Sequence, residues 1–488
     1  MPLSGTAGND TLTATAPDYI LNGLAGDDTL IGGSTYNYFG YYTYDFSWML
    51  GYHAVDRTYF AAPGLVQLPD QLNGGLGDDM LIGGQGSDWL TGGDGNDLVR
   101  GQLGDDFMVN GAGTDRYIGG DGQDTFVVEA NAGSQRFRIN LSQNKILNDS
   151  FGKVEKILGV EHVRGATDRP NELIGKSGTN VLTGGNKGDK LVGLGGDDVL
   201  KGGAGRDVYL GGHGNDWANV AASQANGIKV NLMQQKVVDD GSGNTETIKG
   251  VENLYGTANS DVLVGDNRAN IFASNGGADT INGKGGVDTL ISGPEAMVAD
   301  LRAGTFSIMG AQGTVNNVEN LVGSLYAADT LLGDGGNNVL VAGGAQVITD
   351  FLIGIQPGDV LRGRGGNDKL IGTGVDVQMF GGSGNDRLIS AFGHNDELTG
   401  GPGSDVFVFK GNAGASATRT VKDFEDDVDT VRINASEFGL NPNLSATDVI
   451  NTYGTTVNGH AALDFGGELI VFEGVTNLND LSDDLVLF

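Results

Sequence analysis

Residues 74–127 are six consecutive nonapeptides: GGLGDDMLI, GGQGSDWLT, GGDGNDLVR, GQLGDDFMV, NGAGTDRYI and GGDGQDTFV. The sixth place of each nonapeptide is aspartate, and the eighth place is apolar. Glycines at the first, second and fourth places permit tight turns and positive φ angles. The last three places alternate polar, apolar and polar, which predicts a short strand with one inward side chain. Two nonapeptides therefore predict one eighteen-residue coil of a right-handed spiral of parallel strands.

Such a spiral places one carboxylate and several glycine carbonyls in every turn. Hard oxygen ligands in a flexible cage suit Ca²⁺, so we expect metal sites between aspartates of neighbouring coils, which lie eighteen residues apart. The expected pairs are Asp79/Asp97, Asp88/Asp106, Asp97/Asp115, Asp106/Asp124, Asp189/Asp207, Asp198/Asp216, Asp261/Asp279 and Asp368/Asp386. The complete set of expected metal ligands adds Asp10, Asp28, Asp288, Asp359 and Asp405 to these residues.

The repeat resembles that of the RTX (repeats-in-toxin, hemolysin-type) family, in which the nonapeptide GGxGxDxUx binds Ca²⁺. The resemblance implies an all-β fold, a right-handed parallel β-roll or β-solenoid, and several Ca²⁺ ions as the only cofactor. Residues 409–488 contain VKDFEDDVDTVRI and end in DDLVLF. They resemble the C-terminal cap and type I secretion signal of RTX proteins, so the family implies export by a type I system.

The nonapeptides come in blocks that are separated by a recurring module. The module reads FRINL…KVEKILGVEHVRG first, then IKVNL…ETIKGVENLYG, then MVADL…GTVNNVENLVG. We interpret these segments as longer, Ca²⁺-poor coils, because none is large enough for a core of its own. The predicted organisation is 1–33, imperfect RTX coils; 34–73, an aromatic-rich insertion; 74–127, block 1; 128–174, non-repeat coils; 175–219, block 2; 220–255, non-repeat coils; 256–291, block 3; 292–353, non-repeat and degraded coils; 354–408, block 4; and 409–488, the cap.

The insertion is the one stretch dense in aromatic rings, STYNYFGYYTYDFSWMLGYHAVDRTYF at 34–60. It is either a small cap over the first coils or an exposed surface for self-association, a cell-surface glycan or a lipid headgroup. Both alternatives remain open at the level of sequence.

Composition bounds the function. A formal charge of −33 argues against nucleic acid as a partner. With no cysteine in the chain, metal must replace disulfides as the staple of a secreted protein. Without metal we expect an unfolded chain, because the acidic charges repel one another and the core is thin. The sequence has no apolar run long enough to span a membrane, and MPLSGTAGND does not resemble a signal peptide. We therefore expect an extracellular protein without a cleaved N-terminal signal, associated with the cell surface.

The search for chemistry finds neither HExxH nor GxSxG in the sequence. We expect no catalytic residues and a secreted, non-enzymatic Ca²⁺-binding structural or adhesion protein, such as a surface-layer, matrix or filament subunit. The alternative is an extracellular polysaccharide lyase or epimerase on a β-solenoid. In that case the 34–70 insertion would bind sugar, and Asp45 and Asp56 would be the acid and base.

Overall fold

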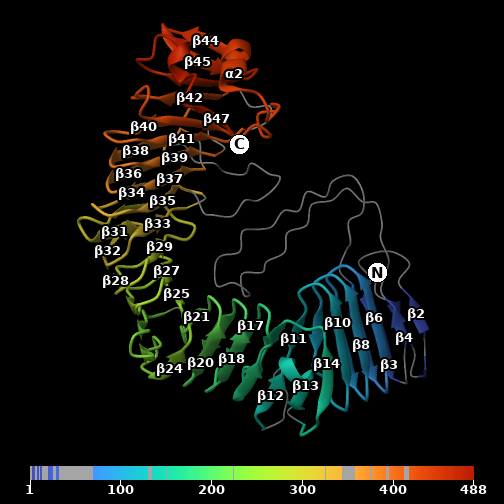
Figure 1. Cartoon of the computed structure of the whole chain (residues 1–488). Coiled ribbons are helices and arrows are strands. Elements are labelled where there is room, and N and C mark those ends of the chain that lie inside the picture. Colours follow the sequence, from blue (N-terminus) through green and yellow to red (C-terminus); the bar gives the residue numbers. More distant parts are fainter. Residues whose placement is uncertain are drawn as a thin grey trace. The chain divides into compact units, whose positions relative to one another are not determined.

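The computed structural model describes residues 3–5, 8–9, 11–13, 20–25, 29–31, 70–129, 135–149, 151–223, 225–324, 326–342, 358–373, 376–391, 395–411 and 417–488. The chain divides into two compact units, Met1–Tyr255 and Gly256–Phe488. Both are built almost entirely of β-strands, with a single α-helix in the described residues, α2 (Ala446–Tyr453) (Figure 1). The expected all-β spiral of parallel strands is therefore confirmed. The aromatic insertion, with Asp45 and Asp56, lies outside the described residues.

In the first unit the chain alternates between two parallel sheets, so that each coil adds one strand to each sheet. The strands of the first sheet are β1 (Leu3–Ser4), β3 (Ile20–Ala25), β5 (Gln71–Leu76), β7 (Trp89–Asp94), β9 (Phe107–Val109), β11 (Thr125–Val127), β15 (His162–Arg164), β17 (Val181–Gly185), β19 (Val199–Gly203), β21 (Trp217–Asn219) and β25 (Asn253–Tyr255). The second sheet contains β2 (Thr11–Thr13), β4 (Thr29–Ile31), β6 (Met80–Gln85), β8 (Leu98–Leu103), β10 (Arg116–Asp121), β12 (Phe137–Asn140), β13 (Lys145–Asn148), β14 (Glu155–Leu158), β16 (Asn171–Ile174), β18 (Lys190–Gly195), β20 (Val208–His213), β22 (Lys229–Asn231), β23 (Lys236–Asp239) and β24 (Glu246–Lys249). A 3₁₀ turn, Leu141–Gln143, follows β12.

The second unit repeats this arrangement. Its first sheet contains β27 (Ile271–Ala273), β29 (Thr289–Ile291), β33 (Asn320–Val322), β35 (Val339–Ala342), β37 (Lys369–Gly372), β39 (Arg387–Ser390), β41 (Val406–Phe409), β43 (Thr430–Ile433) and β47 (Leu485–Leu487). Its second sheet contains β26 (Val262–Val264), β28 (Thr280–Asn282), β30 (Met297–Asp300), β31 (Thr305–Ile308), β32 (Ala311–Asn316), β34 (Thr330–Leu332), β36 (Val360–Gly365), β38 (Gln378–Ser383), β40 (Glu397–Thr399), β42 (Ala417–Val421), β44 (Gly454–Val457), β45 (His460–Asp464) and β46 (Glu468–Phe472). A second 3₁₀ turn spans Leu478–Leu481.

The strand register follows the eighteen-residue coil. Met80 of β6 pairs with Leu98 of β8, and Trp89 of β7 pairs with Phe107 of β9. Several strands are longer than the three residues expected, because the first glycines of the next nonapeptide also pair with the neighbouring coil. β6, for example, is six residues long. The turn proper is correspondingly short.

The eighth place of each nonapeptide points inward and forms the core. In residues 74–127 these side chains are buried with no exposed surface: Leu81, Leu90, Val99, Met108, Tyr117 and Phe126. One inward side chain per strand leaves a thin core, so the stability of the spiral depends on the interactions that its turns make.

The non-repeat modules insert two antiparallel strands into the second sheet. In the first module β14 continues the ladder parallel to β10, β13 lies antiparallel between β14 and β12, and β12 pairs parallel with β16. β24 and β23 repeat this pattern after β20, and β32, β31 and β30 repeat it between β28 and β34. The C-terminal cap uses the same device, with β46 parallel to β42 and then β45 and β44 antiparallel.

The cap also carries the α-helix and a buried ion pair. Ser445 caps α2, and Asp448 completes a reciprocal capping box. The guanidinium of Arg419, which has no exposed surface, is paired with Glu468 and donates to the Lys410 carbonyl at 2.7 Å. No helix in the described residues is long and apolar enough to cross a membrane.

Candidate metal centre

The sixth-place residues form two columns in each unit, because each of them lies directly before a strand or is its first residue. The first column precedes strands of the first sheet. In the first unit it consists of Asp70, Asp88, Asp106, Asp124, Glu161, Asn180, Asp198, Asp216 and Glu252. The second column lies at the starts of strands of the second sheet. It consists of Asp79, Asp97, Asp115, Glu155, Asn171, Asp189, Asp207 and Glu246.

The second unit has the same two columns. Its first column consists of Asn270, Asp288, Glu319, Asn338, Asp368, Asp386, Asp405 and Asp429. Its second column consists of Asp261, Asp279, Asp329, Asp359, Val377 and Asp396. Almost all of these side chains are buried, which is unusual for aspartate unless each charge is compensated.

A recurring hydrogen bond joins most column residues to the next coil. The backbone N–H of Asp88 donates to Oδ1 of Asp106 at 2.8 Å, and the N–H of Asp106 donates to Oδ1 of Asp124 at 2.9 Å. The structure brings together all eight expected aspartate pairs by this bond, at 2.8 or 2.9 Å. Asp359 and Asp405 accept the same bond, from the N–H groups of Asp329 and Asp386. Asp10 and Asp28 lie outside the described residues.

The second carboxylate oxygen has a different environment. In Asp88, Asp97, Asp106, Asp124, Asp198, Asp288, Asp368, Asp386 and Asp405 it is buried and accepts no hydrogen bond. It faces the first-place glycine of its own turn and a carbonyl of the next coil. A Cβ placed on Gly101 would lie 2.0 Å from Oδ2 of Asp106 and 2.9 Å from the Gly119 carbonyl oxygen. Glycine is thus required here because two oxygens converge on its Cα.

The electrostatics of these carboxylates favour a bound cation. Burial raises the pKa of Asp106 to about 8, and it raises the pKa of Asp88 and Asp97 to about 7. Burial outweighs the backbone hydrogen bond that would lower each pKa. A negative charge in this position is therefore costly unless a cation compensates it. Carboxylate and carbonyl oxygens without competing donors fit Ca²⁺, which takes six to eight such ligands.

Not every column position is equally suited to a cation. The hydroxyl of Tyr117 donates to Oδ2 of Asp115 at 2.8 Å, and Tyr209 donates in the same way to Asp207 at 3.4 Å. Oδ2 of Asp189 accepts from the Gly185 N–H, and Oδ2 of Asp279 accepts from the Ser274 hydroxyl. All four of these aspartates belong to the second column, and their hydrogen-bond donors compete with a cation for the carboxylate.

Sequence reasoning missed several members of the columns. Asp329 is the sixth residue of SLYAADTLL (324–332), in the stretch that we expected to be degraded. Asp396 is the sixth residue of AFGHNDELT (391–399), and one extra residue, Ser390, hides its phase. Consistent with that extra residue, the N–H of Asp386 reaches Oδ1 of Asp405 nineteen positions later. The remaining missed residues are the carboxylates Asp70, Asp429, Glu155, Glu161, Glu246, Glu252 and Glu319 and the amides Asn171 and Asn338.

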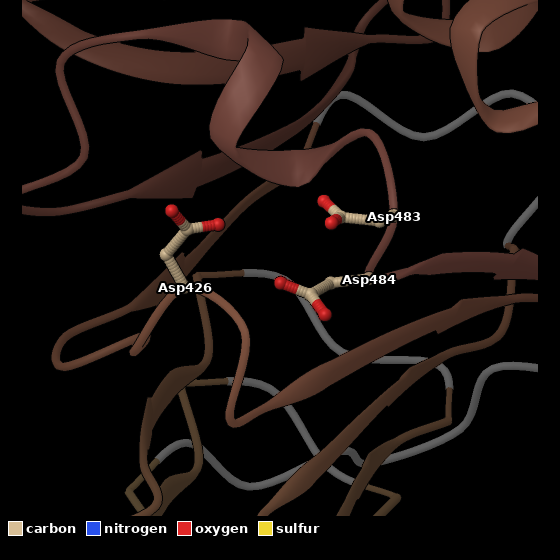
Figure 2. A group of neighbouring side chains, drawn as sticks. All are labelled: Asp426, Asp483 and Asp484. Carbon is tan, nitrogen blue, oxygen red and sulfur yellow. The ribbon is translucent and has the colours of Figure 1, made fainter.

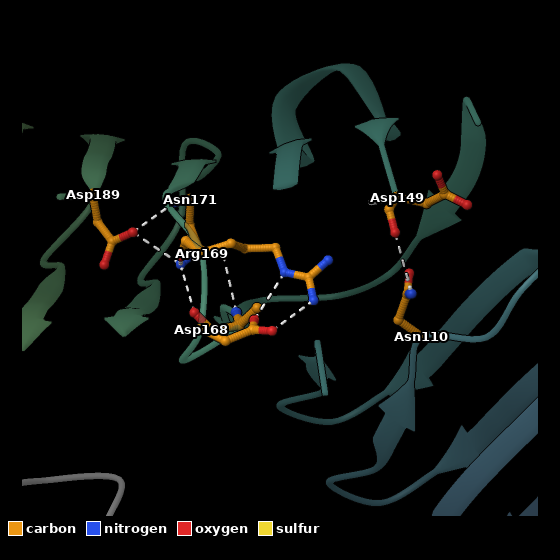
Figure 3. A network of polar contacts seen from close by, with 7 residues as sticks. Asn110, Asp149, Asp168, Arg169, Asn171 and Asp189 are labelled. Carbon is orange, nitrogen blue, oxygen red and sulfur yellow. Dashed lines mark hydrogen bonds and ion pairs between the residues drawn. The ribbon is translucent and has the colours of Figure 1, made fainter. Parts of the chain in front are cut away.

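Asparagine occupies one position in each column of the first unit, Asn180 in the first column and Asn171 in the second, and Figure 3 shows Asn171. Both the backbone N–H and the side-chain amide of Asn171 donate to Oδ1 of Asp189, at 2.6 and 2.9 Å. The amide also donates to the Ala166 carbonyl. Nearby, the buried Arg169 bonds to Asp168, and the Asn110 amide donates to the Asp149 carbonyl at 3.4 Å. An uncharged residue occupies this position of the second column, and its own amide hydrogens satisfy the surrounding carbonyls.

The cap carries a separate acidic cluster, Asp426, Asp483 and Asp484 (Figure 2). One oxygen from each residue lies within 4.8 Å of the others. Asp426 and Asp483 are exposed, and Asp484 accepts a hydrogen bond from the Asp427 N–H at 3.1 Å. We assign no ion to this cluster, since water can solvate its exposed charges.

Comparison with known proteins agrees with these columns. A family model described as the RTX calcium-binding nonapeptide repeat matches residues 4–38, 73–108, 111–126, 183–218, 255–290, 326–345, 358–376, 362–395 and 378–407. No curated protein sequence matches the chain. One similar solved structure is the extracellular lipase LipA from Serratia marcescens, with 16% identity and a TM-score of 0.17.

The lipase match covers 65% of this chain and 40% of the lipase chain. A likeness that weak carries no argument about fold or activity. The family match is independent of it and recurs from residue 4 to residue 407. The matched nonapeptides are calcium-binding, and they supply most of the aspartates in both columns. The chain therefore belongs to the RTX calcium-binding repeat proteins.

Proposed function

We propose that this chain is a secreted calcium-binding structural or adhesion protein that folds on binding Ca²⁺ outside the cell. The observation that carries the proposal is the pair of columns of buried carboxylates, whose second oxygens converge with backbone carbonyls on glycine. The thin core and the formal charge of −33 leave the metal-free chain poorly stabilised. Calcium binding then contributes directly to the free energy of folding, because the sites do not exist in the unfolded chain.

The usual calcium affinity of extracellular modules supports folding outside the cell. Such modules have dissociation constants of roughly 10⁻⁴–10⁻³ M, which are higher than those of cytosolic calcium sensors. A chain with sites of that class stays unfolded in the cytosol, can pass an export channel, and folds outside. RTX repeats are typical of secreted proteins, which agrees with this order of events.

The carboxylates support a structural role over catalysis. In the described residues, the buried carboxylates of the columns are held by backbone N–H groups of the preceding coil. A surface hollow of about 480 Å³ in the first unit is lined by residues that include Leu141, Lys176 and His213, and no carboxylate lines it. Glycoside cleavage needs a pair of carboxyl groups that flank the substrate. For assembly, we propose the aromatic insertion as the contact with a second copy or a cell-surface glycan.

Three measurements test this proposal. Circular dichroism should show β structure that disappears on addition of a calcium chelator and returns with calcium. Electron microscopy of the calcium-loaded protein should show filaments or lattices. Deletion of residues 34–69 should abolish assembly or surface attachment without loss of the calcium-induced β signal. Release of reducing sugar or of unsaturated uronate from polysaccharide would refute the non-enzymatic proposal, and a β signal insensitive to chelation would refute calcium-coupled folding.

A further inference from the structure

The first column does not end where the nonapeptides end. In the first module His162 of β15 occupies the register position after Thr125 of β11, so Glu161 stands where the next aspartate would stand. In the third module Asn320 follows Thr289 in the same way, which places Glu319 after Asp288. A glutamate thus continues the column although the two residues are more than thirty positions apart.

These glutamates make the hydrogen bond of a column aspartate. Oε2 of Glu161 accepts from the Asp124 N–H at 2.9 Å, and Oε2 of Glu319 accepts from the Asp288 N–H at 2.8 Å. In the second module Oε2 of Glu252 accepts from the Asp216 N–H at 2.9 Å. The extra methylene of glutamate compensates for a different backbone path in the turn.

At these positions a backbone carbonyl oxygen also lies beside the second aspartate oxygen. A Cβ on Gly119 would lie 2.2 Å from Oδ2 of Asp124 and 2.1 Å from the Gly159 carbonyl oxygen. A Cβ on Gly283 would lie 2.2 Å from Oδ2 of Asp288 and 2.0 Å from the Asn317 carbonyl oxygen. This is the convergence seen at Gly101 in the middle of block 1. The buried Oδ2 atoms of Asp124 and Asp288 accept no hydrogen bond.

A three-residue turn produces this arrangement in all three modules. Its first residue adopts a left-handed conformation, with φ of 61° at Gly159, 60° at Gly250 and 50° at Asn317. Valine follows, and then the glutamate. Glycine adopts that conformation at little cost and asparagine at a modest one, which agrees with glycine in the first two modules and asparagine in the third.

An asparagine follows Glu161 and another follows Glu319, and each interrupts the run of carboxylates in its first column. The side-chain amide of Asn180 donates to the Glu161 carbonyl at 2.7 Å, and the amide of Asn338 donates to the Glu319 carbonyl at 2.8 Å. The Oδ1 atoms of Asn180 and Asn338 accept from the N–H groups of Lys176 and Asp334. An uncharged amide therefore occupies the position of the next carboxylate and satisfies the carbonyls with its own hydrogens.

We propose that Glu161 and Glu319, with Glu252 as the middle copy, are Ca²⁺ ligands that complete the last site of a run of carboxylates in the first column. The other ligands are Asp124 with the Gly159 carbonyl, and Asp288 with the Asn317 carbonyl. The modules are thus not calcium-poor at this edge. The asparagine that follows separates one run of calcium sites from the next. This assignment does not depend on the biological role proposed above.

The second column differs and provides a control. Glu155 follows Asp115 in register and accepts its N–H at 3.2 Å, but the Tyr117 hydroxyl already bonds to the second oxygen of Asp115. The Tyr117 side chain is fully buried and fills the space with its own donor. We expect no ion between Asp115 and Glu155.

Glu319 is the better of the two test positions. The ammonium of Lys176 lies 2.5 Å from Oε1 of Glu161 and competes with a divalent cation there. Among the residues that the structure describes, Glu319 forms no ion pair. In the calcium-saturated full chain, native mass spectrometry should count one Ca²⁺ fewer in Glu319→Gln than in the wild type. Glu295→Gln, at an exposed glutamate of the same unit, and Glu155→Gln should keep the wild-type count.

Two further variants keep the test decisive. Glu319→Asp keeps the charge but shortens the side chain, so it should also lose one ion. Asn338→Asp should gain one ion, because it restores a carboxylate beyond the junction. If Glu319→Gln does not fold, Glu161→Gln should show the same loss in the first unit. A wild-type count in folded Glu319→Gln or Glu161→Gln, a loss in Glu155→Gln, or no gain in Asn338→Asp would overturn the proposal.

Discussion

Replacing Asp97 with asparagine should have opposite effects in the presence and absence of calcium. Asp97 is buried in the middle of the second column, its Oδ1 accepts the Asp79 N–H at 2.8 Å, and its Oδ2 accepts no hydrogen bond. Asparagine keeps the Oδ1 acceptor and removes the charge. Asn180 and Asn338 already occupy equivalent positions, so the backbone tolerates the change.

The magnitude follows from the pKa of Asp97 in the metal-free fold. Burial raises this pKa from 3.8 to about 7. At about 1.4 kcal/mol per pH unit, a shift of about three units corresponds to about 4 kcal/mol. Because the folded-state pKa is the higher one, the stabilising contribution is complete below the unfolded-state value and is lost as the pH rises through 7. Asparagine has no charge to bury and should avoid this loss.

Because the metal-free chain is expected to be unfolded, the assay is its refolding by a stabilising osmolyte in chelator, followed by circular dichroism at pH values from 4 to 8. The osmolyte titration gives the free energy of unfolding of each variant. The advantage of Asp97→Asn over the wild type should grow with pH and level off above pH 7. In calcium the order should reverse, because the variant lacks one anionic ligand. Asp94→Asn, at the exposed third place of the same nonapeptide, removes the same charge and should show neither effect. A difference that does not change with pH, or a less stable variant in chelator at pH 8, would refute this reasoning.

Three other substitutions test the remaining features of the fold. Gly101→Ala should destabilise the calcium-loaded protein by at least about 1–3 kcal/mol in denaturant unfolding, since its methyl group would overlap two ligand oxygens. Gly178→Ala has open space around it and should change little; equal effects would contradict the argument. Gln102→Gly should stabilise the protein by about 1 kcal/mol, because Gln102 has a φ of 87°, and an unchanged or lower stability would show that strain there is negligible. Arg419→Met should destabilise the cap by about 3–5 kcal/mol in the same assay, because it leaves Glu468 as a buried unpaired charge, whereas a near-neutral effect would show that water reaches this carboxylate.

The spiral could be predicted from sequence because its signal is local and repeated. Each nonapeptide contains its own turn glycines, carboxylate and inward side chain, so register follows from counting. Counting residues fails where an extra residue interrupts the nine-residue repeat. Ser390 adds one residue and conceals Asp396, although the neighbouring pattern is intact. The nonapeptide pattern alone predicts strands that are too short, because glycines at the first and second places also pair with the neighbouring coil.

The glutamate members of the columns could not be found by period. Glu161 follows Asp124 by thirty-seven residues, and the two become neighbours only after β12 and β13 are laid into the sheet. The recurring V-E pair followed by asparagine or histidine is visible in the sequence. The position of its glutamate in the column, however, depends on the antiparallel strands of the module. Whether an aspartate has a free second oxygen also needs the structure. Tyr117 occupies an ordinary eighth place and yet blocks Asp115.

The asparagine junctions have a consequence for how the protein responds to calcium concentration. In a linear array, cooperativity spreads from one site to the next through shared ligands. Neighbouring first-column aspartates such as Asp106 and Asp124 would share ligands in this way, but Asn180 and Asn338 interrupt the first column with a neutral amide. Each run of sites therefore saturates as its own short cooperative group. The calcium-binding isotherm of the whole chain should therefore be a sum of several steps with different midpoints. It should be less steep than the isotherm of one uninterrupted array that binds the same number of ions.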